Sequence, residues 1–252
     1  MTLGARGGPA DVRRWRMSSR RRHAVGWALA FAVMGRAGHA HAHDYWLTVE
    51  PSRPEAQRPV ALRMWVGEAM KPESERPFEA DRTDAFVHVT ADGPSEVEAR
   101  DGTPLWSGAL PEGGHLFALQ RNAAFIELSA SKFEGYLRHE GLDSIVEARR
   151  RRGEAQAPGK ERYRRYLKLW VPVGEAEDSS FAHALGWDYE LVLRDRPEVD
   201  GDLVVEARFR GEPLAGAALT VVRDGVSVGA VRSTDAAGRA AVANLEAGTY
   251  LV

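Results

Sequence analysis

The sequence contains no cysteine among its 252 residues. Without thiols, neither a disulfide framework nor a zinc site with thiolate ligands can form. The fold must therefore be held together by its apolar core. Any metal site must use histidine, carboxylate, methionine or a free amine, and these donors suit nickel, cobalt or copper.

The sequence also has few signs of catalysis. It has no phosphate-binding glycine-rich loop, no cysteine nucleophile, and no pair of carboxylates spaced for hydrolysis of a glycosidic bond. No serine, histidine and aspartate set stands out either. We therefore expect a binding protein and not an enzyme.

Basic residues are unevenly distributed along the chain. Residues 1–42 hold 8 of the 34 Lys and Arg residues, but only Asp11 of the 36 Asp and Glu residues. The remaining 210 residues therefore carry 26 basic and 35 acidic side chains, a net charge of −9. This negative charge argues against nucleic acid or an anionic membrane as partner and favours cations.

The first 42 residues have the features of an export signal. A basic cluster at 20–22 precedes an apolar run at 24–35, which is too short to span a bilayer as a helix. Met17 is an alternative start of translation. We expect a signal peptide at 1–42, a periplasmic or secreted mature protein, and no membrane span after cleavage.

The cleavage site determines the new N-terminus. Ala40-His41-Ala42 fits the small-x-small pattern and would make His43 the first residue. Cleavage after Ala40 would instead leave His41-Ala42-His43. Either product starts with or near a histidine, and a free N-terminal amine beside an imidazole chelates transition metals.

These residues define a candidate metal site. His43 would bind through its amine and imidazole, with His41 contributing if cleavage occurs earlier, and Asp44 would orient or join the site. A further imidazole must come from the fold. His115 is our first choice and His88 the second, because both lie in predicted strands. The alternative is that these histidines are incidental.

Short apolar stretches separated by Pro and Gly predict a mainly β fold. Residues 43–195 are expected to form an antiparallel β-sandwich with a helical insertion at about 131–153. Ser131 and Glu134 have the spacing of a capping box, and Gly141 is expected to divide the insertion into two helices. The predicted strands include residues 46–49, 60–66, 85–89, 115–119, 125–128, 167–171 and 187–193.

The sequence pattern changes after a predicted linker at 194–201. Short strands at 203–209, 218–222, 228–231 and 240–242 predict a small Ig-like or prealbumin-like β-sandwich at 200–252. The sequence stops within its last predicted strand, so we expect this module to be truncated at its C-terminus.

Three passages together resemble a bacterial family of exported proteins, DUF4198. They are residues 42–47, 133–142 and 159–174, while the glycine turns at 211–217 and 234–238 resemble prealbumin-like or CNA-B-like modules. Some members of that family are described as periplasmic components of nickel or cobalt uptake. The resemblance therefore implies transition-metal binding and a membrane metal transporter as partner.

Two functions follow as expectations. The first is an exported accessory protein that binds nickel, cobalt or copper for uptake or delivery. The alternative is a non-catalytic interaction or adhesion module, in which loops of the sandwiches contact a protein or glycan and the histidines play no part.

Overall fold

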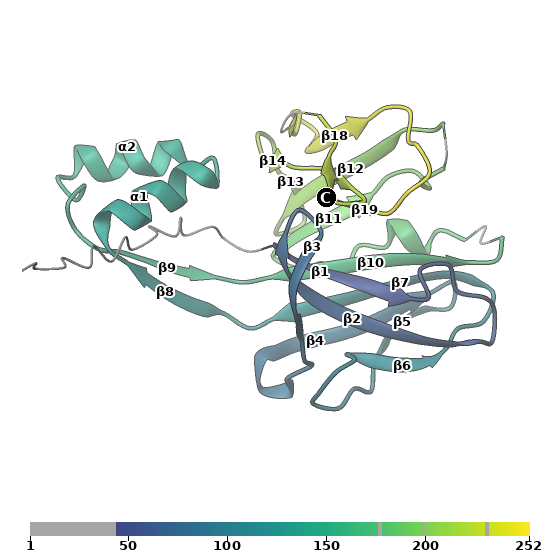
Figure 1. Cartoon of the computed structure of the whole chain (residues 1–252). Coiled ribbons are helices and arrows are strands. Elements are labelled where there is room, and N and C mark those ends of the chain that lie inside the picture. Colours follow the sequence, from purple (N-terminus) through teal and green to yellow (C-terminus); the bar gives the residue numbers. More distant parts are fainter. Residues whose placement is uncertain (1–43, 176–177, 199, 230–231) are drawn as a thin grey trace, which may run out of the picture. The chain divides into compact units, whose positions relative to one another are not determined.

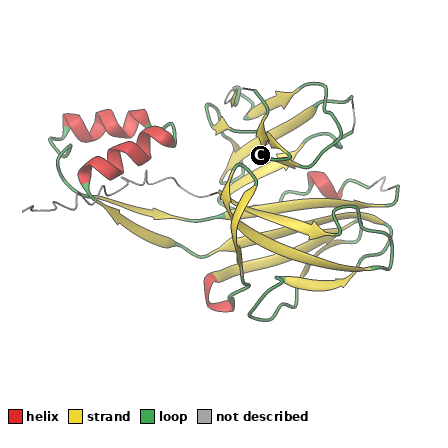
Figure 2. Ribbon diagram, viewed as in Figure 1, coloured by secondary structure: helices red, strands yellow, loops and turns green. Residues whose placement is uncertain are grey.

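The structure, a computed structural model, describes residues 44–175, 178–198, 200–229 and 232–252. The predicted signal peptide, His41 and His43 lie outside these residues. The strand pairs in the described part are antiparallel (Figure 1), and helix is limited there to two α-helices and short single turns (Figure 2). This confirms the expected mainly β fold class with a helical insertion. No helix in the described ranges is long and apolar enough to cross a membrane.

One sheet is built around a long central strand, β2. Strand β1 pairs along one edge of β2, while β3 and β6 share the other edge, β3 next to Met64–Glu68 and β6 next to Pro59–Leu62. The bounds are β1 (Asp44–Glu50), β2 (Pro59–Glu68), β3 (Lys71–Arg76) and β6 (Trp106–Ala109).

A second sheet has the order β10-β7-β4-β5. Its central strand, β7, is buried along most of its length, as expected for a strand covered on both faces. The bounds are β4 (Thr83–Thr90), β5 (Gly93–Glu96), β7 (Gly113–Arg121) and β10 (Tyr166–Val173), and the single turn η1 (Ala80–Arg82) precedes β4.

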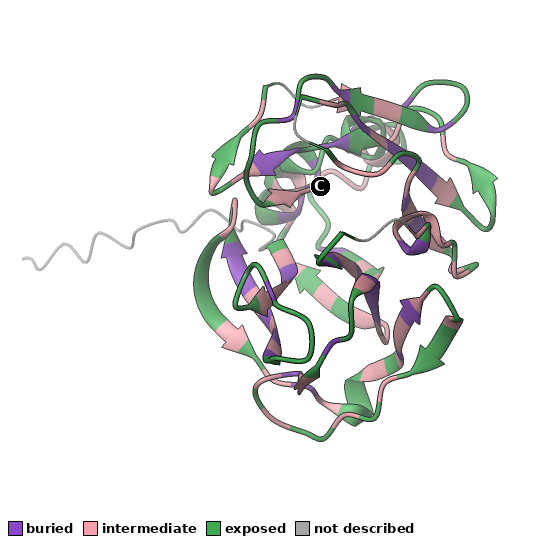
Figure 3. Ribbon diagram, turned by 90° about the vertical axis from the view of Figure 1, so that its right-hand side faces the viewer, coloured by how far each residue is buried: buried purple, intermediate pink, exposed green. Residues whose placement is uncertain are grey.

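The two sheets share one hydrophobic core. Alternate residues of β2 and β7 point into it, and several of them are completely inaccessible to solvent, including Leu62, Met64, Phe117 and Leu119. Figure 3 shows the resulting alternation of buried and more exposed residues along the strands. A core formed by alternate residues of two antiparallel sheets is typical of a β-sandwich.

The helical insertion sits at the end of a separate two-stranded ribbon. Strands β8 (Ala124–Leu128) and β9 (Gly159–Tyr163) pair with each other, and between them lie α1 (Ala130–His139) and α2 (Asp143–Arg151). The helices have their own small core, formed by Phe133, Leu137 and Val146. Gly141, at φ +70°, divides the two helices as expected.

The start of the first helix differs from the predicted capping box. Ser129, and not Ser131, is the N-cap residue, and it makes no side-chain capping bond. Ser131 lies inside the first turn. Glu134 instead forms ion pairs with Arg138 and Arg150, which link α1 to α2. The acidic residue is therefore used for pairing the helices.

Gly159 is required by the packing of the helices against the ribbon. A Cβ atom at this position would lie 1.9 Å from the Phe133 ring. We expect Gly159→Ala to destabilise the helical insertion by about 1–3 kcal/mol, because a buried ring would have to move. Hydrogen exchange of α1 and α2 measures this loss.

Gly135 supplies the matched control for that substitution. It lies inside α1, and a Cβ atom added there would meet no other atom within 4 Å. We expect Gly135→Ala to stabilise the helix by roughly 0.5–1 kcal/mol. If hydrogen exchange of α1 and α2 in Gly159→Ala is as slow as in the unchanged protein, the tight contact with Phe133 would be contradicted.

The C-terminal module has a second core, which includes Leu203, Val205, Leu219 and Val242. Its main sheet has the order β11-β12-β13, with β18 also on β12. The bounds are β11 (Tyr189–Leu193), β12 (Leu203–Phe209), β13 (Glu212–Pro213), β14 (Ala218–Leu219), β15 (Val222–Arg223), β16 (Val226–Ser227), β17 (Arg232–Ser233), β18 (Arg239–Val242) and β19 (Tyr250–Leu251).

The division between the two domains differs from the one expected at 195–200. Strand β11, expected to belong to the first sandwich, pairs with β12 from Tyr189↔Phe209 to Leu193↔Val205. Leu191 also packs against the core of the C-terminal module. Strands β11 and β12 are therefore direct neighbours, and the predicted linker comes between them in the sequence.

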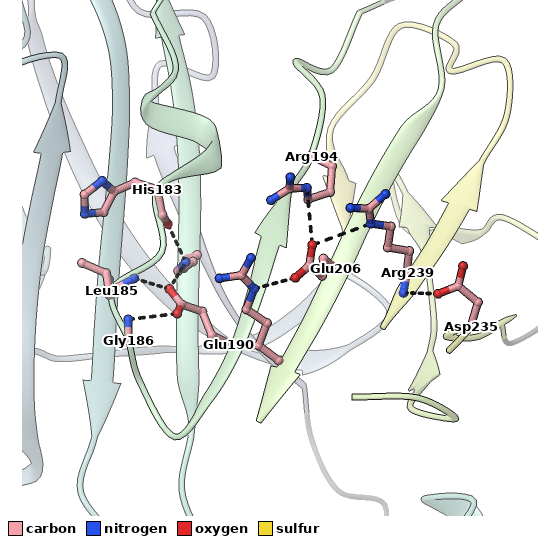
Figure 4. Close-up of polar contacts among 10 residues, drawn as sticks. His183, Leu185, Gly186, Glu190, Arg194, Glu206, Asp235 and Arg239 are labelled. Carbon is pink, nitrogen blue, oxygen red and sulfur yellow. Dashed lines mark hydrogen bonds and ion pairs between the residues drawn. The ribbon is translucent and has the colours of Figure 1, made fainter. Parts of the chain in front are cut away.

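A buried ion pair joins β11 to the first sandwich. The Glu190 carboxylate accepts hydrogen bonds from the Lys168 ammonium of β10 at 2.5 Å, and from the backbone N–H groups of Leu185 and Gly186 at 2.6 and 3.1 Å (Figure 4). Glu190 is only 2% exposed. The loop that provides these N–H groups follows the single turn η2 (Ser180–Ala182).

Candidate functional site

The structure brings together two of the predicted ligands, His88 and His115. His88 Nε2 lies 2.9 Å from His115 Nδ1, and the two rings are stacked with centroids 5.1 Å apart. His88 is the cross-strand partner of Phe117, and its ring stacks on that ring at 4.3 Å. His115 is therefore its diagonal neighbour on the same face of the sheet.

The hydrogen bonds of the pair indicate its protonation. His115 Nε2 is 3.0 Å from the Pro111 carbonyl oxygen, which can only accept a hydrogen bond, so Nε2–H is the donor. His115 Nδ1 is then the acceptor and His88 Nε2–H the donor. Burial, together with the nearby His115, lowers the pKa of His88 to about 4. The His88 ring is thus neutral at pH 7, and a metal would have to displace the hydrogen bond between the two rings.

Asp44, another predicted ligand, begins β1. It is exposed, and its carboxylate accepts the Ala69 N–H at 2.9 Å in the turn that joins β2 to β3. Asp44 follows His43 directly in the sequence. His41 and His43 themselves lie outside the described residues.

Carboxylates gather near the start of β1. Loss of water around the Glu140 carboxyl raises its pKa, and the negative charges of Glu161 and Asp44 raise it further, against the effect of His139. Burial raises the pKa of Tyr136, helped by its interaction with Glu161. Glu161 Oε2 is buried and has no hydrogen-bond partner within the described ranges. A nearby cation would stabilise the charged form of these carboxylates.

An arginine fixes this end of β1 to the base of the ribbon. The Arg165 guanidinium lies 4.0 Å from the centroid of the Tyr45 ring and 4.5 Å from that of Tyr163. Such cation–π contacts favour a single arrangement of the three side chains. In Figure 1, β1 accordingly begins next to the start of β10 and the base of β8 and β9.

The two groups of predicted ligands lie at opposite ends of the sandwich strands. Tyr166, which follows Arg165, pairs with Gln120, five positions along β7 from His115. Five residues of a strand span about 17 Å. Asp44 and the histidine pair are therefore not parts of one site. Sequence reasoning missed Glu140 and Glu161, because their separation from Asp44 along the chain gives no sign of proximity.

Within the described ranges, no group of three or more His, Asp or Glu side chains is close enough to hold a metal ion. His43 and His41, the sequence candidates for metal ligands, lie outside those ranges.

One motif escaped the sequence analysis. Gly225-Val226-Ser227-Val228-Gly229 has the Gly-x-Ser-x-Gly spacing of a hydrolase nucleophile elbow. In the structure it forms the hairpin of β15 and β16, where an elbow would need a turn from a strand into a helix. The Ser227 hydroxyl donates to the Gly229 carbonyl at 3.3 Å. The motif thus lies in a β-hairpin, with Ser227 in strand β16, and gives no support for hydrolysis.

Comparison with known proteins gives a family and no further relative. Residues 40–252 match a family described as a domain of unknown function, DUF4198. No curated protein and no solved structure matches the chain.

Proposed function

Since this chain belongs to the DUF4198 family, whose description assigns no activity, we propose from its chemistry that it is an exported protein that binds nickel, cobalt or copper. The metal would be held by the N-terminal amine and imidazole of His43, with His41 contributing if the signal is cut earlier. Delivery to a membrane metal transporter is part of the same proposal.

One observation supports this location. Asp44, the residue after His43, and Glu161 both act electrostatically on the Glu140 carboxyl. The negative charges of Asp44 and Glu161 raise the pKa of Glu140, and the same charges would favour a cation near this carboxylate. A chelating amine and imidazole beside them would supply the nitrogen ligands that select a transition metal over calcium or magnesium.

The histidine pair is not included in the proposed site. His88 and His115 direct ring nitrogens at each other, and Asp44 lies at the other end of the sandwich strands. We therefore propose Glu140, and not His115 or His88, as the partner of the N-terminal residue.

The test is a titration of two mature proteins with Cu(II), Ni(II) and Co(II). One begins at His43, confirmed by intact mass, and the other carries one additional glycine before it. We expect one equivalent of metal to bind to the first, and the additional residue to weaken binding at least about tenfold, since it removes the six-membered chelate of amine and imidazole.

Two substitutions refine the test. Glu140→Gln is expected to weaken the metal several-fold, whereas Glu127→Gln, on an exposed ribbon carboxylate paired with Lys160, is expected to leave it unchanged. Equal affinity of the His43 and glycine-extended proteins would move the metal away from the terminus. No binding of any of the three metals would favour the interaction module instead.

A further inference from the structure

Three arginines surround a single buried carboxylate on the sheet of the C-terminal module. Glu206, on the central strand β12, has a side chain only 6% exposed. Its Oε1 accepts from Arg208 Nε at 2.6 Å, and its Oε2 lies 3.4 Å from Arg194 Nε and 3.7 Å from Arg239 Nε. One carboxylate cannot neutralise three guanidinium groups, so this cluster carries a charge of +2.

Each arginine approaches Glu206 through Nε alone. Among the described residues, the terminal nitrogens of these three guanidinium groups have no hydrogen-bond acceptor, and in Figure 4 those of Arg194 and Arg239 point away from the carboxylate. The side chains are 37%, 28% and 48% exposed for Arg194, Arg208 and Arg239. The outer edges of the guanidinium groups are therefore accessible from solvent.

Another cluster in the same chain shows how arginines are arranged when their role is structural. On the helical insertion, Arg138 and Arg150 share Glu134 through their terminal nitrogens. Each also uses its other terminal nitrogen on a second acid, Asp143 or Glu147. That cluster is saturated by acidic residues. The one around Glu206 has no second acid on its guanidinium groups within the described ranges.

We propose that Arg194, Arg208 and Arg239 form a binding site for a phosphate group, with Glu206 as the residue that positions them. A guanidinium presents parallel N–H donors that match the oxygens of a phosphate. Phosphate carries a charge of about −1.5 to −2 at neutral pH, which balances the +2 of the cluster. A concentration of positive charge on a chain whose residues 43–252 carry −9 would otherwise bring no benefit.

Glu206 has a specific part in this site. It accepts a hydrogen bond from Arg208 Nε and forms ion pairs with the Nε of Arg194 and Arg239, so it holds the three side chains together and reduces their mutual repulsion. A hydrogen-bonded arginine loses less conformational entropy when a ligand arrives. The site is separate from the proposed metal site, and the two proposals can fail independently.

The experiment titrates the mature protein with inorganic phosphate at low ionic strength, followed by NMR shifts of the arginine side-chain N–H groups. We expect saturable binding that weakens as salt is added. The double variant Arg194→Gln/Arg239→Gln should bind at least about tenfold more weakly, because charge-assisted hydrogen bonds are lost. The matched control Arg138→Gln/Arg150→Gln removes the same charge from the saturated cluster and should bind as the unchanged protein does.

Glu206→Gln provides a second test that does not depend on losing affinity. It raises the cluster from +2 to +3 and keeps an amide oxygen that can accept from Arg208 Nε, so we expect the folded variant to bind phosphate several-fold more tightly. Circular dichroism confirms folding of each variant. Absence of phosphate shifts in the unchanged protein, or equal binding by the two double variants, would overturn the proposal.

The source of the phosphate is distinguished by a parallel measurement. The unchanged protein and the Arg194→Gln/Arg239→Gln variant are each sedimented with phosphatidic acid vesicles. Sedimentation of the unchanged protein, but not of the variant, would identify a lipid headgroup. Binding of inorganic phosphate without vesicle association would identify a soluble phosphate.

Discussion

Glu190→Ala is expected to lower the free energy of unfolding by about 3–5 kcal/mol, because it leaves the Lys168 ammonium buried without a counter-charge. The same change removes the acceptor for two backbone N–H groups, those of Leu185 and Gly186. Burial already lowers the pKa of Lys168, against the opposing effect of Glu190. Urea denaturation at pH 7 measures the loss.

Two controls make this result specific to the buried pair. Glu127→Ala removes an exposed carboxylate 3.4 Å from Lys160 and should cost less than about 1 kcal/mol. The double change Lys168→Met/Glu190→Leu should be less destabilising than Glu190→Ala alone, because no charge is then left buried. Equal losses of unfolding free energy for Glu127→Ala and Glu190→Ala would show that the buried Lys168–Glu190 pair contributes no more to stability than an exposed ion pair.

We also expect acid to lower the free energy of unfolding. His88 binds its proton in the folded chain only near pH 4, against an ordinary value of 6.5 that applies to the unfolded chain. Between these values the unfolded chain holds more protons, so stability is present above about pH 6.5 and falls as the pH decreases towards 4. The groups whose charges act on this pair are His115 itself and Asp178, which lies close to His115.

The size of this loss has an upper bound of about 3 kcal/mol, and solvent near the partly exposed His88 ring reduces it to on the order of 1–2 kcal/mol. His88→Gln keeps a donor for His115 Nδ1 but does not titrate. We therefore expect its unfolding free energy to change less between pH 6.5 and pH 4 than that of the unchanged protein. His139→Gln, on the exposed end of α1, should keep the full pH dependence. Identical pH slopes for His88→Gln and the unchanged protein would exclude the pair as their source.

The strands of the sandwich could be predicted where their residues alternate. The apolar residues of β2, β4 and β7 face a core, and the period of two is visible in the sequence. Strand β3, with the sequence Lys-Pro-Glu-Ser-Glu-Arg, escaped prediction because it is an edge strand whose residues are mostly exposed. Its structure comes from pairing with β2 and not from its own pattern.

The candidate sites were predictable only in part. His88 and His115 could be named, since each follows the alternation of its strand, but their contact depends on the register of β4 on β7. The surroundings of Asp44 and the arginines around Glu206 depend on residues far apart in the sequence. Pairing of β11 with β12 was likewise missed, because the sequence between these strands has the composition of a linker.

The ribbon that carries the helices also bears on how such chains can vary. Leu128 and Gly159 are paired neighbours, so the chain leaves and re-enters the ribbon at adjacent positions, and everything between them has a core of its own. Replacing residues 129–158 by a tight turn would close the ribbon without altering the register of any strand. Insertions and deletions during evolution can thus change this lobe in size or remove it while the sandwich is inherited intact.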